Sequence, residues 1–173
     1  RWKARDRERR DEWGRLHHGT ALEKTTVILK RAGLSGTPRE RLAVRAGLSP
    51  GELKRLLDQI LSRRDALLLD GDPPKLFHRD VYRELQEGIL AEAGAYHKNH
   101  PLRKGCPKEE LRIRIGTAVD AKLFNRALRD LEEGEKIVLE QDTVRLPSYA
   151  VALSDDLESL RAAIENRYRE AAL

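Results

Sequence analysis

Apolar residues recur at helical spacing in two separate parts of the chain, and each series is followed by two short apolar stretches. The first series is Leu53, Leu56, Leu57, Ile60 and Leu61, and the second is Phe124, Ala127, Leu128 and Leu131. Spacings of three and four residues predict helices with one buried face. The stretches that follow, 66–69 with 75–77 and 136–139 with 143–146, predict β-hairpins around turn-forming residues. The pattern therefore indicates the same helix-and-hairpin unit twice.

An internal repeat precedes each of these helices. TPRERLAVRAG at 37–47 aligns with CPKEELRIRIG at 106–116 at an offset of 69 residues, with identities at Pro38/Pro107, Glu40/Glu109, Leu42/Leu111, Arg45/Arg114 and Gly47/Gly116. Thr37 with Glu40, and Ser49 with Glu52, predict two capping boxes that start successive helices, with Pro38 at a first helical position. The turn between the two helices has the length found in a helix-turn-helix. A repeat of this size indicates one structural unit used twice.

Further helices are predicted at 20–33 and at 80–98, and Asp120 is predicted to cap the helix that carries the second apolar series. We therefore predict a mainly α fold with small β-hairpins (α+β), made of tandem winged-helix units. The predicted divisions are a charged connector helix at 1–18, winged helix 1 at 19–78, winged helix 2 at 79–150 and a final helix at 151–173.

The two end segments carry their own expectations. Trp13 and Leu16 of the connector are expected to dock on the first unit. The final helix is predicted to be capped by Ser154, with Leu157, Leu160, Ile164 and Tyr168 on its apolar face. It would either begin a third unit or pack back on the second.

The charge is distributed unevenly. The formal net charge of the chain is +5. Segment 17–78 carries eleven basic and seven acidic residues, whereas segment 79–148 carries thirteen of each and is neutral. The basic excess could attract a polyanion to the first unit, and no such bias exists in the second.

The sequence gives no sign of catalysis. It contains no P-loop, dinucleotide-binding fingerprint or nucleophile-elbow motif, and no apolar run is long enough to span a membrane. Cys106 is the only cysteine, so there is no disulfide framework and a reducing compartment is expected. His97, His100 and Cys106 resemble an incomplete metal set, but a loop and a helix end explain them better, with Cys106 as the cap of a helix. We predict no catalytic, cofactor or metal residue. The chain has no methionine, and we interpret it as part of a longer protein.

Nucleic-acid contacts are the remaining candidate chemistry, because the third helix of a winged helix is its usual reading element. Its outward basic residues in the first unit are Lys54, Arg55, Arg63 and Arg64, and in the second unit they are Lys122 and Arg126. These side chains could hold a phosphate backbone. The alternative is that both sets are ordinary solvated faces, and acidic neighbours favour this for the second set.

Residues 79–160 resemble the C-terminal winged-helix region of the bacterial selenocysteine-specific translation elongation factor family, SelB. The resemblance rests on His97, Pro101-Leu102, Gly105, the helix start Glu109-Glu110-Leu111-Arg112 and the wing end Arg145-Leu146-Pro147. It implies a larger cytoplasmic protein whose N-terminal GTPase binds GTP and delivers selenocysteyl-tRNA. Later winged helices would grip the selenocysteine insertion hairpin of the mRNA.

On this reading the present chain is non-enzymatic, monomeric and chiefly a spacer and hinge, with tRNA or the ribosome as further RNA partners and with no membrane partner. The alternatives are a tandem winged-helix DNA-binding regulator and a protein-interaction scaffold.

Overall fold

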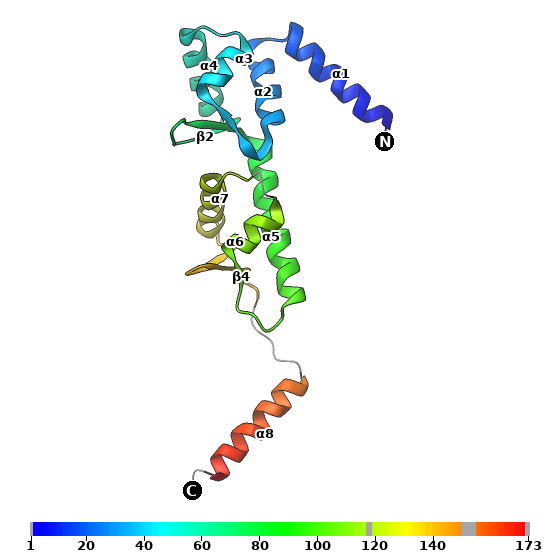
Figure 1. The fold of residues 1–173 in the computed structure, drawn as a ribbon, viewed down its shortest axis with the longest axis vertical. Helices are drawn as coiled ribbons and strands as arrows, with labels where there is room; N and C mark the ends of the chain where they lie inside the picture. The colour runs from blue at the N-terminus through cyan, green and yellow to red at the C-terminus, as the bar shows by residue number, and fades with distance from the viewer. Residues whose placement is uncertain (1, 117–118, 150–154, 172–173) are drawn as a thin grey trace.

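The computed structural model describes residues 2–116, 119–149 and 155–171. The first half of the fold, up to residue 78, contains α1 (Trp2–His18), α2 (Ala21–Ala32), the 3-10 helix η1 (Gly33–Ser35), β1 (Thr37–Pro38), α3 (Arg39–Ala46), α4 (Pro50–Ser62), β2 (Ala66–Leu69) and β3 (Lys75–His78). The second half, from residue 79, contains α5 (Arg79–Asn99), β4 (Cys106–Pro107), α6 (Lys108–Ile115), α7 (Ala121–Glu133), β5 (Val138–Glu140) and β6 (Thr143–Arg145). Helix α8 (Asp155–Ala171) follows it. Figure 1 shows these elements along an elongated molecule. The predicted α+β class is confirmed.

Capping side chains start four of the helices, and His78 is the cap of α5. Ser49 accepts a hydrogen bond from the backbone N–H of Glu52, and the Glu52 carboxylate accepts from the backbone N–H of Ser49, as predicted. Asp120 Oδ1 accepts from the backbone N–H groups of Lys122 and Leu123 and so caps α7. An additional capping box, between Thr20 and Glu23, starts α2.

The caps predicted at Thr37 and Cys106 are wrong. Both residues lie in two-residue strands, where Thr37 pairs with Leu76 and Cys106 with Val144. The helices α3 and α6 that follow have no side-chain cap. Strand pairing with the wing takes precedence here, and the extended prolines that come next end each strand. Burial raises the pKa of the Cys106 thiol to about 11, so it is an inert core residue.

Two three-stranded antiparallel sheets repeat the same order, β1-β3-β2 and β4-β6-β5. Each sheet packs against the hydrophobic core of its own half of the chain. The first core includes Ile28, Leu29, Leu42, Leu53, Leu56, Leu57, Ile60 and Leu76. The second includes Leu85, Ile89, Tyr96, Leu111, Leu123, Phe124, Leu128, Leu131 and Val144. Both predicted helical series therefore supply core residues.

The first sheet has apolar side chains packed on both of its faces. Along β2, Ala66 and Leu68 belong to the first core, and Leu67 and Leu69 pack against the second. Side chains alternate between the faces of a strand, so the apolar run of β2 serves two cores.

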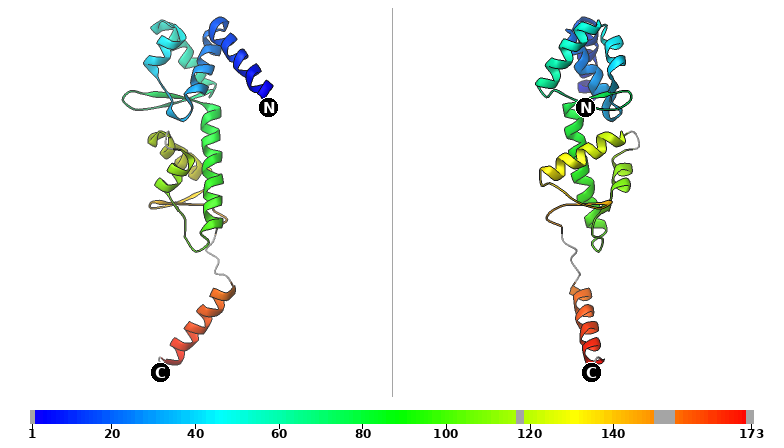
Figure 2. Two further views of the ribbon diagram at one scale, coloured as in Figure 1. Left: turned by 45° about the vertical axis from the view of Figure 1, so that its right-hand side comes forward. Right: turned by 90° about the vertical axis from the view of Figure 1, so that its left-hand side faces the viewer.

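Helix α5 connects the two halves and runs alongside the second one (Figure 2). It has 21 residues and buries Leu85, Ile89, Ala93, Tyr96 and His97. Among the described residues, no helix is both long enough and apolar enough to cross a membrane.

The terminal helices make few core contacts. Leu16 of α1 packs against the first core, as expected, but Trp13 is 56% exposed and stacks on His17 at 5.4 Å between ring centroids. The docking predicted for Trp13 is therefore wrong. In α8, residues 162–171 are exposed, including Ile164 and Tyr168, which gives no support to packing back on the second unit. The predicted cap Ser154 and the side chains of Leu157 and Leu160 lie outside the described residues.

Candidate nucleic-acid interface

Helix α4 presents the first set of predicted contact residues to solvent. Its buried stripe, from Leu53 to Ile60, places Lys54 and Arg55 on the outward side. Arg63 closes the helix, and Arg64 follows with a positive φ of 57°. All four side chains are exposed, and within the described residues none makes a hydrogen bond or ion pair to another residue. The structure thus leaves these four cations available to a ligand.

The second set, on α7, is committed to contacts inside the molecule. Lys122 Nζ lies 3.4 Å from the carbonyl oxygen of Asp70, at the tip of the first wing. Arg126 Nε donates to Asp130 Oδ1 at 2.7 Å, and Asp130 Oδ2 accepts from the Tyr82 hydroxyl at 2.7 Å. Burial and the hydrogen bond to Asp130 raise the pKa of Tyr82, so the phenol remains protonated and donates.

Helix α3 adds three free cations that the sequence analysis passed over. Arg39, Arg41 and Arg45 are exposed, and no side-chain hydrogen bond or ion pair to them occurs among the described residues. Their outward positions on the first helix of the helix-turn-helix are visible from helical spacing, but the nucleic-acid contacts were predicted only on the third helix of each unit.

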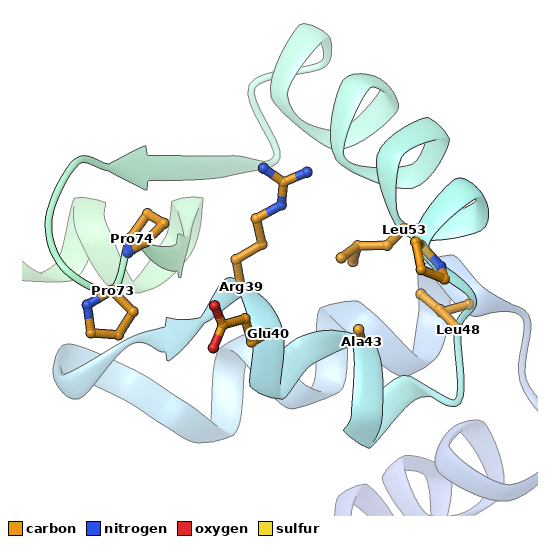
Figure 3. A pocket seen from close by; sticks show the side chains of 8 residues that line it. Arg39, Glu40, Ala43, Leu48, Leu53, Pro73 and Pro74 are labelled. Carbon is orange, nitrogen blue, oxygen red and sulfur yellow. The ribbon is translucent and has the colours of Figure 1, made fainter.

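A groove of about 520 Å³ lies between α3, the start of α4 and the tip of the first wing (Figure 3). Its lining residues are Arg39, Glu40, Ala43, Leu48, Pro50, Leu53, Pro73 and Pro74. Most of them are apolar, and Arg39 and Glu40 are the only charged ones.

The aligned positions of the second unit carry cations that are hydrogen-bonded within the chain. Arg112, which aligns with Ala43, donates to both carboxylate oxygens of Glu109 at 2.9 and 2.6 Å and to the Val119 carbonyl at 3.3 Å. Lys108, which aligns with Arg39, donates to the carbonyl oxygen of Gln141 in the second wing. The two units therefore differ at one aligned position: Ala43 lines a groove, whereas Arg112 is held by Glu109 and Val119.

His97 has a structural role. Its Nε2 accepts the backbone N–H of Leu146 at 3.2 Å, and its ring stacks on Tyr149 at 3.7 Å between centroids. The Tyr149 hydroxyl donates to the Pro101 carbonyl at 2.7 Å. Burial, with the nearby Arg145 charge, lowers the pKa of His97, so the ring stays neutral. These contacts hold the end of α5 to the exit of the second wing, and no group of three metal-ligating side chains exists in the described parts of the chain.

Comparisons with known proteins point to one family. Residues 90–146, which include α6, α7 and the second wing, match the family model described as elongation factor SelB, winged helix. The chain is 32% identical over 144 residues to the selenocysteine-specific elongation factor of Desulfomicrobium baculatum. That match covers 77% of this chain but only 23% of the length of its relative. The resemblance is thus confirmed, and the chain belongs to the SelB family through its winged-helix region.

Proposed function

We propose that this chain forms part of the arm of a selenocysteine-specific elongation factor. The arm joins a GTP-binding body that carries the tRNA to an end that grips the insertion hairpin of the mRNA. The family membership supports this role. The chain itself supplies winged-helix scaffolding and no catalytic step, and GTP belongs to the body rather than to this part.

Within the arm, the first unit makes the RNA contacts and the second serves as scaffold. The observation that carries this assignment is the difference between the third helices. Lys54, Arg55, Arg63 and Arg64 are exposed, and no side-chain hydrogen bond or ion pair within the described residues involves them, whereas Arg126 pairs with Asp130 and Lys122 contacts Asp70. Free cations can replace the counterions of a phosphate backbone, which gives binding that depends on salt.

The test compares two paired variants of the full chain, Lys54→Ala/Arg55→Ala on α4 and Lys122→Ala/Arg126→Ala on α7. Fluorescence anisotropy would measure binding to a fluorescein-labelled tRNA, to the insertion hairpin and to a duplex DNA of equal length. We expect the α4 variant to weaken tRNA and hairpin binding by about tenfold and to reduce the salt slope by roughly 2. We expect the α7 variant to bind as the unsubstituted chain does.

Three results would contradict the proposal. Equal losses in both variants would remove the distinction between the units. A clear preference for the duplex DNA would favour a DNA-binding regulator. Unchanged binding in the α4 variant would show that the exposed basic face is only solvated surface.

A further inference from the structure

The first wing carries apolar residues on the face that points away from its own core. Phe77 of β3 is fully buried and belongs to the second core, together with the partly buried Leu67 and Leu69 of β2. Gly36, with φ +69°, permits this approach, because a Cβ there would lie 2.5 Å from the Phe77 ring. The first sheet is therefore a layer between two cores.

Polar contacts surround this apolar layer. Lys75 Nζ of β3 donates to Asp120 Oδ2 at 2.7 Å, and the side chains are only 32% and 18% exposed. The same Asp120 caps α7, and its backbone N–H approaches the Leu34 carbonyl at 3.4 Å. One residue thus ties the helix start of the second unit to the first unit through both its side chain and its backbone.

The covalent connection between the two units is also short. Strand β3 ends at His78, and α5 begins at Arg79 with no residue between them. The His78 ring accepts the backbone N–H of Asp80 at 3.0 Å, and the backbone N–H of Arg79 donates to the Asp65 carbonyl at 3.0 Å. Lys30 of α2 pairs with Asp80 at 2.9 Å. Little backbone freedom is left at this junction.

We propose that the two winged helices move as one rigid body, joined by Phe77 packing and by the Lys75–Asp120 pair. The outer face of the first wing is the joint itself, so that face is withdrawn from contact with nucleic acid. RNA contacts of the first unit are left to α3 and α4, and a displacement of the first unit is transmitted to α7 and the second wing.

The experiment measures a distance across the joint in the full chain. Cysteines at Asp58 on α4 and Glu133 on α7, in a Cys106→Ala background, carry nitroxide labels for pulsed electron spin resonance. Both positions are exposed and make no ion pair in the described structure. Three variants are compared with this chain: Phe77→Arg, the double variant Lys75→Met/Asp120→Asn, and the control Arg145→Met on the second wing. Asparagine is a good N-cap, so the double variant keeps the start of α7.

We expect one narrow distance distribution for the chain without these substitutions and for Arg145→Met. We expect a broad or shifted distribution for Phe77→Arg and for the double variant, with unchanged helix content by circular dichroism. If Phe77→Arg does not fold, the double variant decides. A broad distribution in the chain without these substitutions would overturn the proposal, and so would a double variant as narrow as that chain. The test uses no RNA, so its failure is distinct from failure of the proposed RNA role.

Discussion

The first and second wings have the same strand order and opposite surroundings. Strand β3 places Leu76 in its own core and Phe77 in the neighbouring core, whereas β6 places Val144 in its core and Arg145 at the surface, paired with Glu140. Pairing aligns Leu76 with Thr37 and Val144 with Cys106, so Phe77 and Arg145 occupy equivalent positions. One position on the outer face thus distinguishes a wing that joins two units from a wing that ends in solvent.

The largest effect is expected from that position. Phe77→Ala should lower the free energy of unfolding by about 3–5 kcal/mol, because it opens a cavity in a core shared by both units. The matched change Arg145→Ala removes an ion pair whose side chains are 29% and 49% exposed, and it should cost less than about 1 kcal/mol. Urea unfolding followed by circular dichroism compares the two. Similar costs would mean that the two wings do not differ energetically.

The outline of this comparison was predictable from the sequence, but the role of the first wing was not. Helical spacing and the caps Ser49 and Asp120 were found correctly because they are local signals. Residues 66–69 form an uninterrupted apolar run, which is typical of a strand buried on both faces, but the sequence predicted only a wing there. A local pattern cannot say what covers the second face.

For the candidate site, too, the sequence predicted local features but not contacts between distant parts of the chain. The basic positions on α4 and α7 could be found by helical spacing, and Arg126 could be expected to meet Asp130 four residues on. The contact of Lys122 with Asp70 spans 52 residues and depends on how the two units meet. Whether Lys54, Arg55, Arg63 and Arg64 bind RNA stays a prediction.

A smaller effect is expected at the Lys75–Asp120 pair. Asp120→Asn keeps the cap of α7 but removes a partly buried charged hydrogen bond, and it should cost about 1–3 kcal/mol. Glu140→Gln, on the exposed pair of the second wing, should cost less than about 1 kcal/mol.

The role of the Asp120 carboxylate can also be tested by the pH dependence of unfolding. Burial alone would raise the pKa of Asp120, but the Lys75 hydrogen bond and the backbone N–H groups of α7 lower it. A lowered carboxyl pKa gives stability that is full above the unfolded value of 3.8 and is lost as the pH falls below it. Asp120→Asn should therefore flatten the loss of stability in acid. An unchanged acid profile would contradict the role assigned to this carboxylate.

A third effect is expected near neutral pH, at the histidine that contacts the chain just after the second wing. His97 Nε2 must be unprotonated to accept the Leu146 N–H, and burial lowers its pKa. The unfolded chain then binds the extra proton, so stability is full above about pH 6.5 and falls as the pH decreases from there. His97→Gln should reduce this slope in unfolding experiments between pH 8 and roughly 5.

Part of the slope should survive in that variant. Burial also lowers the pKa of His78 at the exit of the first wing, where its ring accepts the Asp80 N–H. The exposed His18 of α1 provides the control variant His18→Gln. If His97→Gln had no more effect than His18→Gln, the contacts of His97 would not hold the second wing.

The smallest effect is expected from substitutions at the aligned positions 43 and 112, each of which introduces the kind of side chain found in the other unit. Arg112→Ala should remove the guanidinium from the second unit and lower the stability slightly, because the pair with Glu109 and the bond to Val119 are lost. Ala43→Arg should place a guanidinium beside Glu40 and gain up to about 0.5 kcal/mol, which corresponds to a rise in Tm of roughly 1–2 °C. Differential scanning calorimetry resolves both changes. The two units share their helix starts. Opposite signs of the stability change in the two variants would therefore show that the side chain at position 43 or 112 distinguishes the two units here. Destabilisation by Ala43→Arg would instead show that the proline-lined wing tip, absent from the second unit, leaves no room for the arginine.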